Sequence, residues 1–169
     1  MLVLGQNSAE FWPDSLVFRR FFLGALITSL SLEIPSIKIQ TRRRLGRARE
    51  DAEEARRNLC PPFFDSAIDR AFYAVFHAAA AALEWNGIKR TRHAGNEAAF
   101  RQYLIKLEVI EREYGETYLK ARRMRDALFD APIGQDLPDP AEVNELVVEA
   151  QRFVTRIERY LRDAGAMEE

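Results

Sequence analysis

Apolar residues between positions 63 and 85 recur at steps of three and four, which is the spacing of one face of an α-helix. Two prolines precede this stretch and an Asn-Gly pair follows it, as is typical of the two ends of a helix. Further apolar residues widen the face, so we expect neighbours on most sides of this helix. The stretch therefore predicts the central helix of a bundle. A narrow polar seam remains on it, made of Asp69, Arg70, Tyr73, His77 and Glu84.

Apolar stripes with the same spacing predict further helices at residues 41–59, 94–113, 116–130 and 140–165. Tyr114 and Gly115 interrupt the pattern between the second and third of these. Asp139 stands before a proline at the start of the last helix, where it can cap the first turn, and Glu142 occupies the capping-box position. No stretch alternates in the manner of a strand, so the pattern predicts an all-α bundle of about five helices.

Residues 1–40 do not share this periodicity. Their apolar run follows an arginine pair and is only about 12 residues long, whereas a membrane-spanning helix needs about 20. A signal peptide or membrane anchor is the alternative, but the run starts far from the N-terminus and lacks a clear cleavage site. We expect no membrane association, and we expect residues 1–40 to be a poorly ordered extension or to precede the true translation start. The helical domain would then span residues 41–165.

The chain of 169 residues is 47% hydrophobic, enough for one packed domain. Its net charge of -1 conceals an asymmetry, because residues 126–169 contain 11 acidic and 4 basic side chains. The other residues are therefore basic and could offer a surface to an anionic partner. Cys60 is the only cysteine, which excludes an intrachain disulfide and fits a reducing, cytoplasmic location. With two histidines in addition, the sequence predicts no metal site and no cofactor.

Arginines concentrate in the helix predicted at residues 116–130. Arg122, Arg125 and Asp126 share one face of it, and the planar fork of arginine suits phosphate oxygens. The alternative is an Arg-Asp pair that links this helix to the acidic last helix. Arginines also crowd the start of the helix predicted at residues 41–59, where they form either a solvated face balanced by acidic residues or a site for an anionic partner.

Four segments together resemble the HEPN superfamily, the higher eukaryotes and prokaryotes nucleotide-binding domain. These are AFYAVFHAAAAALEWNGI, RHAGNEAAF, ARRMRDALFD and EAQRFVTRI. The similarity is greatest to the small stand-alone HEPN proteins of bacteria and archaea, and it covers residues 42–161. It implies an up-and-down helical bundle that forms a homodimer. In this family Tyr73 and His77 would be a structural signature of the central helix.

Many HEPN proteins are metal-independent ribonucleases or toxins, others bind nucleotides, and many act beside a minimal nucleotidyltransferase antitoxin. The ribonucleases carry an R-x-x-x-x-H motif, whose arginine matches Arg125 here. Asp126 follows it, and Asp130 stands where the histidine would be. A carboxylate repels phosphate and does not replace an imidazole near neutral pH.

The resemblance therefore favours a nucleic-acid or nucleotide-binding component that acts with a partner such as a nucleotidyltransferase. A ribonuclease toxin that uses Arg125 with Asp126 or Asp130 is the alternative, and a dimeric scaffold with no role in nucleic-acid binding is a third possibility. The residues expected to contact RNA or a nucleotide are Arg122, Arg123, Lys89, Arg92 and His93.

Overall fold

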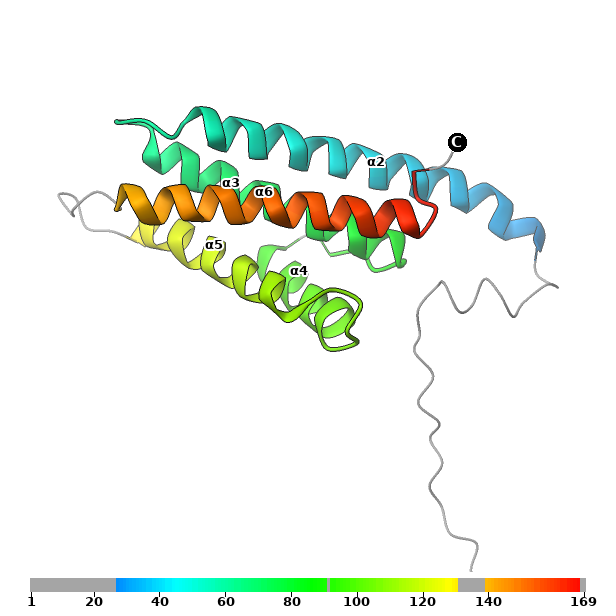
Figure 1. The fold of residues 1–169 in the computed structure, drawn as a ribbon. Helices are drawn as coiled ribbons and strands as arrows, with labels where there is room; N and C mark the ends of the chain where they lie inside the picture. Colours follow the sequence, from blue (N-terminus) through cyan, green and yellow to red (C-terminus); the bar gives the residue numbers. More distant parts are fainter. Residues whose placement is uncertain (1–26, 91, 131–138, 168–169) are drawn as a thin grey trace, which may run out of the picture.

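The computed structural model describes residues 27–90, 92–130 and 139–167. Within these ranges the chain forms five α-helices and no strand, which confirms the predicted all-α class (Figure 1). The helices are α2 (Ile27–Arg57), α3 (Phe64–Trp85), α4 (His93–Phe100), α5 (Arg112–Asp130) and α6 (Pro140–Asp163).

The central position predicted for the helix at residues 63–85 is confirmed by α3, which packs against α2, α4, α5 and α6. Figure 1 shows α2 and α6 running alongside α3, with α5 and α4 on another side of it. The alanine run of α3 is fully enclosed, because Ala78, Ala79, Ala81 and Ala82 have no exposed surface. Small side chains let the neighbouring backbones approach closely, so one helix can serve as the packing centre for the others.

The first bundle helix is longer than the pattern predicted, since α2 begins at Ile27 rather than at residue 41. Ile37 packs against the hydrophobic core, so the helix already contacts the bundle before the predicted start. The apolar stripe of this helix was identified correctly. Its buried members are Leu45, Ala48, Ala52 and Ala55.

The helix predicted at residues 94–113 is wrong in its second half. α4 passes into a π-helical turn (Arg101–Ile105), and the chain then leaves the helix, with Glu108 at a φ of 55°. Leu107, which falls on the apolar stripe of the predicted helix, is 39% exposed. Tyr114 and Gly115, predicted to end a helix, lie inside α5.

The glycine inside α5 has a packing role. A Cβ at Gly115 would lie 3.3 Å from Cγ1 of Ile105, so the absent side chain lets the π-helical turn approach α5 closely. The interruption read from the sequence was therefore a contact site between two segments and not a helix end.

The last helix follows its prediction. The side chain of Asp139 accepts a hydrogen bond from the backbone N–H of Ala141 at 2.9 Å, which confirms it as the N-cap. All eight residues predicted for its apolar face are buried. They are Val143, Leu146, Val147, Ala150, Phe153, Val154, Ile157 and Leu161. None of the helices described here has a stretch apolar and long enough to span a lipid bilayer.

Candidate functional site

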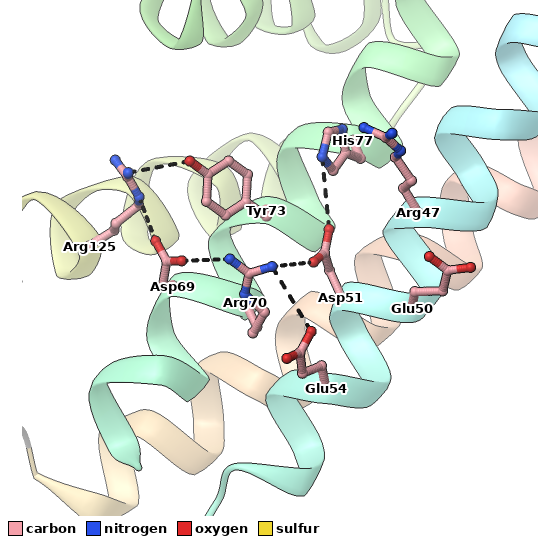
Figure 2. Close-up of a pocket in the computed structure, with 9 residues that line it drawn as sticks. All are labelled: Arg47, Glu50, Asp51, Glu54, Asp69, Arg70, Tyr73, His77 and Arg125. Carbon is pink, nitrogen blue, oxygen red and sulfur yellow. Dashed lines mark hydrogen bonds and ion pairs between the residues drawn. The ribbon is translucent and has the colours of Figure 1, made fainter.

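A chain of charged side chains crosses from α5 through α3 to α2 (Figure 2). Arg125 donates from Nε to Oδ1 of Asp69 at 2.9 Å, and Arg70 donates from Nη2 to Oδ2 of the same carboxylate at 2.9 Å. The other terminal nitrogen of Arg70 donates to Oδ1 of Asp51 at 3.0 Å. Two arginines and two carboxylates therefore alternate across three helices.

The polar seam of α3 supplies the middle of this arrangement. Asp69, Tyr73 and His77 are spaced by four residues, so their side chains stack along one face of the helix. They border a pocket of about 560 Å³, a volume within the range of small-molecule sites. Its lining residues are Arg47, Glu50, Asp51, Glu54, Asp69, Arg70, Tyr73, His77 and Arg125.

Arg125 lies at one end of this pocket, with 18% of its side chain exposed. Its guanidinium carbon is 4.9 Å from the ring centre of Phe72 and 5.3 Å from that of Tyr73. Nη2 also lies 3.5 Å from the hydroxyl of Tyr73, at the long limit of a hydrogen bond. The carboxylate and the two rings hold the guanidinium in one orientation, which favours recognition of a planar or bidentate anion.

His77 faces the opposite end of the pocket. Burial, followed by the positive charges of Arg44, Arg47, Arg70 and His93, lowers its pKa to about 4. The 3.8 Å approach of its Nε2 to Oδ2 of Asp51 is therefore not an ion pair at neutral pH, because the imidazole is neutral. Burial also raises the pKa of Asp51, although Arg70 opposes that shift.

His93, the first residue of α4, packs its imidazole against three rings of α3. The ring centres of Phe76, Phe72 and Tyr73 lie 4.8, 5.2 and 5.9 Å from that of His93. Phe72 and Tyr73 are the two rings that also contact the Arg125 guanidinium. The fold thus brings together two predicted site residues that are distant in sequence.

Other predicted contact residues have different surroundings. Arg122 pairs with the buried carboxylate of Glu97 and, at 3.4 Å, with Asp126, so its guanidinium joins α5 to α4. Arg123, Lys89 and Arg92 are exposed and do not line the pocket. Asp130 is the last residue of α5, and its side chain lies outside the described part of the structure.

The alternative in which an arginine of α5 pairs with the last helix is wrong for Arg125, whose carboxylate partner Asp69 lies on α3. The link from α5 to α6 is made instead by Lys120, with Glu145 at 2.7 Å and Glu149 at 3.2 Å. Arginines near the start of the predicted first helix also make links between helices. Arg44 pairs with Glu84 of α3, and Arg49 pairs with Glu158 of α6, both at 2.7 Å.

Sequence reasoning missed Asp69 and Asp51 as members of the site. The signal available for Asp69 was its place in the polar seam of an otherwise apolar helix, four residues before Tyr73. Asp51 gave less signal, because it stands in a run of acidic residues that read as a solvated face. Only the packing of α2 on α3 buries it to 8% exposure beside Arg70.

The chain was compared with known proteins. The model of a family described as "HEPN domain" matches residues 41–160. A Methanocaldococcus jannaschii protein named "Putative toxin MJ0605" is 32% identical over 100 residues, which cover 59% of this chain and 72% of that protein. A Thermotoga maritima protein named "UPF0332 protein" is 29% identical over 118 residues, 69% of this chain and 87% of that protein.

Proposed function

Since the chain belongs to the HEPN family, we propose that it binds RNA or a nucleotide at the Arg125 end of the pocket and acts with a partner as part of a toxin-type pair. The observation that carries the proposal is the fixed orientation of Arg125 by Asp69, Phe72 and Tyr73. A guanidinium held in this way recognises phosphate oxygens without first losing side-chain freedom.

The distribution of charge supports this end of the pocket over the other. Three carboxylates, those of Glu50, Asp51 and Glu54, project from α2 beside a single pocket-lining arginine of that helix, Arg47, so a polyanion is less favoured there (Figure 2). At the α5 end the exposed Arg123 and Arg92 add positive charge near the helices that carry Arg125 and His93. Phosphate is therefore favoured where α5 and α4 approach α3.

The similarity to a protein named as a toxin supports the second part of the proposal. A toxin of this kind is expected to have a neutralising partner, for which a minimal nucleotidyltransferase is our candidate. An adjacent gene encoding such an enzyme, and co-purification of its product with this chain, would support that partner. Copies that purify only with themselves would favour a homodimer acting alone.

Binding is tested with fluorescently labelled single-stranded RNA at low salt, with a mononucleotide as the competing ligand. We expect Arg125→Ala to weaken RNA binding about tenfold. The slope of the logarithm of affinity against the logarithm of salt concentration should become shallower by about one, as expected for the loss of one phosphate contact. The matched control is Arg112→Ala, which removes the same charge from the other end of α5, where Arg112 is 89% exposed. This control should change the affinity less than about threefold.

Two results would contradict the proposal. Absence of measurable affinity of the unaltered chain for RNA and for nucleotide would favour a dimeric scaffold. Equal losses of RNA affinity in Arg125→Ala and Arg112→Ala would indicate general charge attraction rather than a site at Arg125. Displacement of RNA by the mononucleotide would identify a nucleotide as the simpler ligand of the same site.

Cleavage of RNA is the second candidate function. It is favoured by one specific observation, the contact of His93 and Arg125 with the same two aromatic rings. A neutral imidazole beside a phosphate-binding guanidinium is the pairing that proton transfer at a phosphodiester requires.

A further inference from the structure

Asp69, the residue that orients Arg125, is itself held by a second arginine. Its Oδ1 accepts from Nε of Arg125 at 2.9 Å, and its Oδ2 accepts from Nη2 of Arg70 at 2.9 Å. Rotation of this carboxylate would break at least one of two charged hydrogen bonds, so it keeps one orientation. The orientation of Arg125 therefore depends on Arg70 as well as on Asp69.

Arg70 is held in turn by α2. Its Nη1 donates to Oδ1 of Asp51 at 3.0 Å, and its guanidinium carbon lies 5.2 Å from the ring centre of Tyr73. The planar fork of an arginine can join two carboxylates at fixed angles, whereas the single ammonium group of a lysine cannot. A continuous path of hydrogen bonds thus runs from Asp51 on α2, through α3, to Arg125 on α5 (Figure 2).

Asp51 differs from the other two carboxylates that α2 contributes to the pocket. It is buried, with 8% of its surface exposed, while Glu50 and Glu54 are exposed. Glu54 comes no nearer to Nη1 of Arg70 than 3.9 Å, which is too long for a hydrogen bond. A buried carboxylate loses its hydration and needs a partner that replaces water. Of the three, Asp51 alone is both buried and hydrogen-bonded to Arg70.

We propose that Asp51 and Arg70 are positioning residues that hold Arg125 ready to bind an anion. This inference rests on the proposed binding of RNA or a nucleotide at the Arg125 end of the pocket. Asp51 fixes Arg70, and Arg70 fixes the carboxylate of Asp69, which sets the direction of the Arg125 guanidinium. The packing of α2 on α3 thereby controls the affinity of a site that lies between α3 and α5.

The positioning role and simple charge effects predict opposite results at Asp51. Removing a carboxylate from a pocket that binds an anion should strengthen binding, because a repulsion is lost. Without Asp51, however, Arg70 can turn and Asp69 loses one of its two constraints. Arg125 must then be ordered when the ligand binds, which lowers the affinity. The sign of the change distinguishes the two explanations.

The test uses the full chain and labelled single-stranded RNA at low salt, with folding of each variant checked by circular dichroism and a thermal melt. Asp51→Ala should weaken RNA binding about three- to tenfold, the cost of ordering one long side chain. Arg70→Lys keeps the charge but cannot join two carboxylates, and it should weaken binding to a similar extent. The matched control is Glu158→Ala, which removes a carboxylate that pairs with Arg49 of α2 and with Arg162, outside the pocket lining. The affinity of this control should stay within about twofold.

A double-mutant cycle shows whether Asp51 acts through Arg125. In the Arg125→Ala background, Asp51→Ala should change RNA affinity by less than about twofold, because the path of hydrogen bonds ends at the missing guanidinium. A purely structural effect of Asp51 would lower the affinity by the same factor with and without Arg125. Such an equal loss overturns the positioning role.

The remaining outcomes separate this inference from the proposed function. Unchanged or tighter RNA binding by Asp51→Ala, or an equal loss in Glu158→Ala, overturns the positioning role and leaves the binding proposal standing. Failure of the unaltered chain to bind RNA or nucleotide, or binding that does not depend on Arg125, overturns both. If Asp51→Ala does not fold, Arg70→Lys decides in the same cycle. A loss of affinity that requires Arg125 supports the role, and binding equal to that of the unaltered chain overturns it.

Discussion

Asp69 of α3 accepts the Nε–H of Arg125 of α5 at 2.9 Å, and this pair joins two helices through residues that are 56 positions apart in the chain. The second oxygen of the same carboxylate accepts from Arg70 at 2.9 Å. Asp69 therefore sets the position of the arginine on which the proposed function depends. Because the side chains of Asp69 and Arg125 are 24% and 18% exposed, the pair is partly shielded from water and its loss should be measurable.

Replacing Asp69 with asparagine should lower the free energy of unfolding by about 1–3 kcal/mol, since two guanidinium groups lose a charged acceptor in a partly buried site. Chemical denaturation of the variant measures this change. Asp65→Asn is the control, because Asp65 is exposed in the first turn of the same helix and should contribute less than about 1 kcal/mol. Equal effects of the two substitutions would show that the Asp69–Arg125 pair does not stabilise the fold.

His77 should make the protein less stable in acid. Its pKa is about 4 in the folded chain and about 6.5 when unfolded, so the unfolded state binds more protons between these values. The stabilisation by neutral His77 is complete above pH 6.5 and is lost as the pH falls towards 4. Between pH 7 and 4.5 the unfolding free energies of the unaltered chain and His77→Gln should converge by about 2 kcal/mol. A constant difference across this range would contradict the lowered pKa.

The pair between Arg122 and Glu97 should contribute more to stability than a surface pair. The side chain of Glu97 is 7% exposed, so Glu97→Gln replaces the charged buried acceptor of Arg122 with a neutral amide and should destabilise the fold by about 1–3 kcal/mol. Glu116→Gln is the matched control, because Glu116 pairs with Arg112 at the surface of the same helix. Thermal melts should show less than about 0.5 kcal/mol for this control. If Glu97→Gln lowers the free energy of unfolding by as little as the control does, the Arg122–Glu97 pair does not stabilise the fold.

Two glycines in helices should respond oppositely to alanine. A Cβ at Gly46 in α2 meets no atom within 4 Å, so Gly46→Ala should stabilise the protein by about 0.5–1 kcal/mol. At Gly115 the added Cβ would lie 3.3 Å from Cγ1 of Ile105, and the side chain of Ile105 would have to move. Gly115→Ala should therefore show no gain or a loss. A similar gain at both positions would show that the contact with the π-helical turn is easily relaxed.

Removal of residues 1–40 should leave the bundle folded, because the family match begins at residue 41 and α2 buries its main apolar stripe from Leu45 onward. The midpoint of thermal unfolding should fall somewhat, since Ile37 packs on the core and is lost with the deletion. Circular dichroism and a cooperative melt check this result. A deletion variant that is insoluble or melts without cooperativity would place these residues within the domain.

The sequence alone determined the helical class, the central helix and nearly all of the buried stripes. These features depend on periodicity, helix caps and composition, all of which are set by residues close together in the sequence. The residues of α6 show this clearly, since both the Asp139 cap and the whole apolar face were predictable. The family could also be recognised from motifs that are contiguous in the sequence.

Only the tertiary structure decided the partners of the charged residues. From the sequence, the side chain of Asp69 could face solvent, lie in the core or pair with a neighbouring helix. Its pairing with Arg125 follows from how α5 packs on α3. The same packing places His93 and Arg125 on common rings although 32 positions separate them. Contacts between helices depend on the three-dimensional arrangement of several faces at once, so periodicity along one helix does not specify which charges meet.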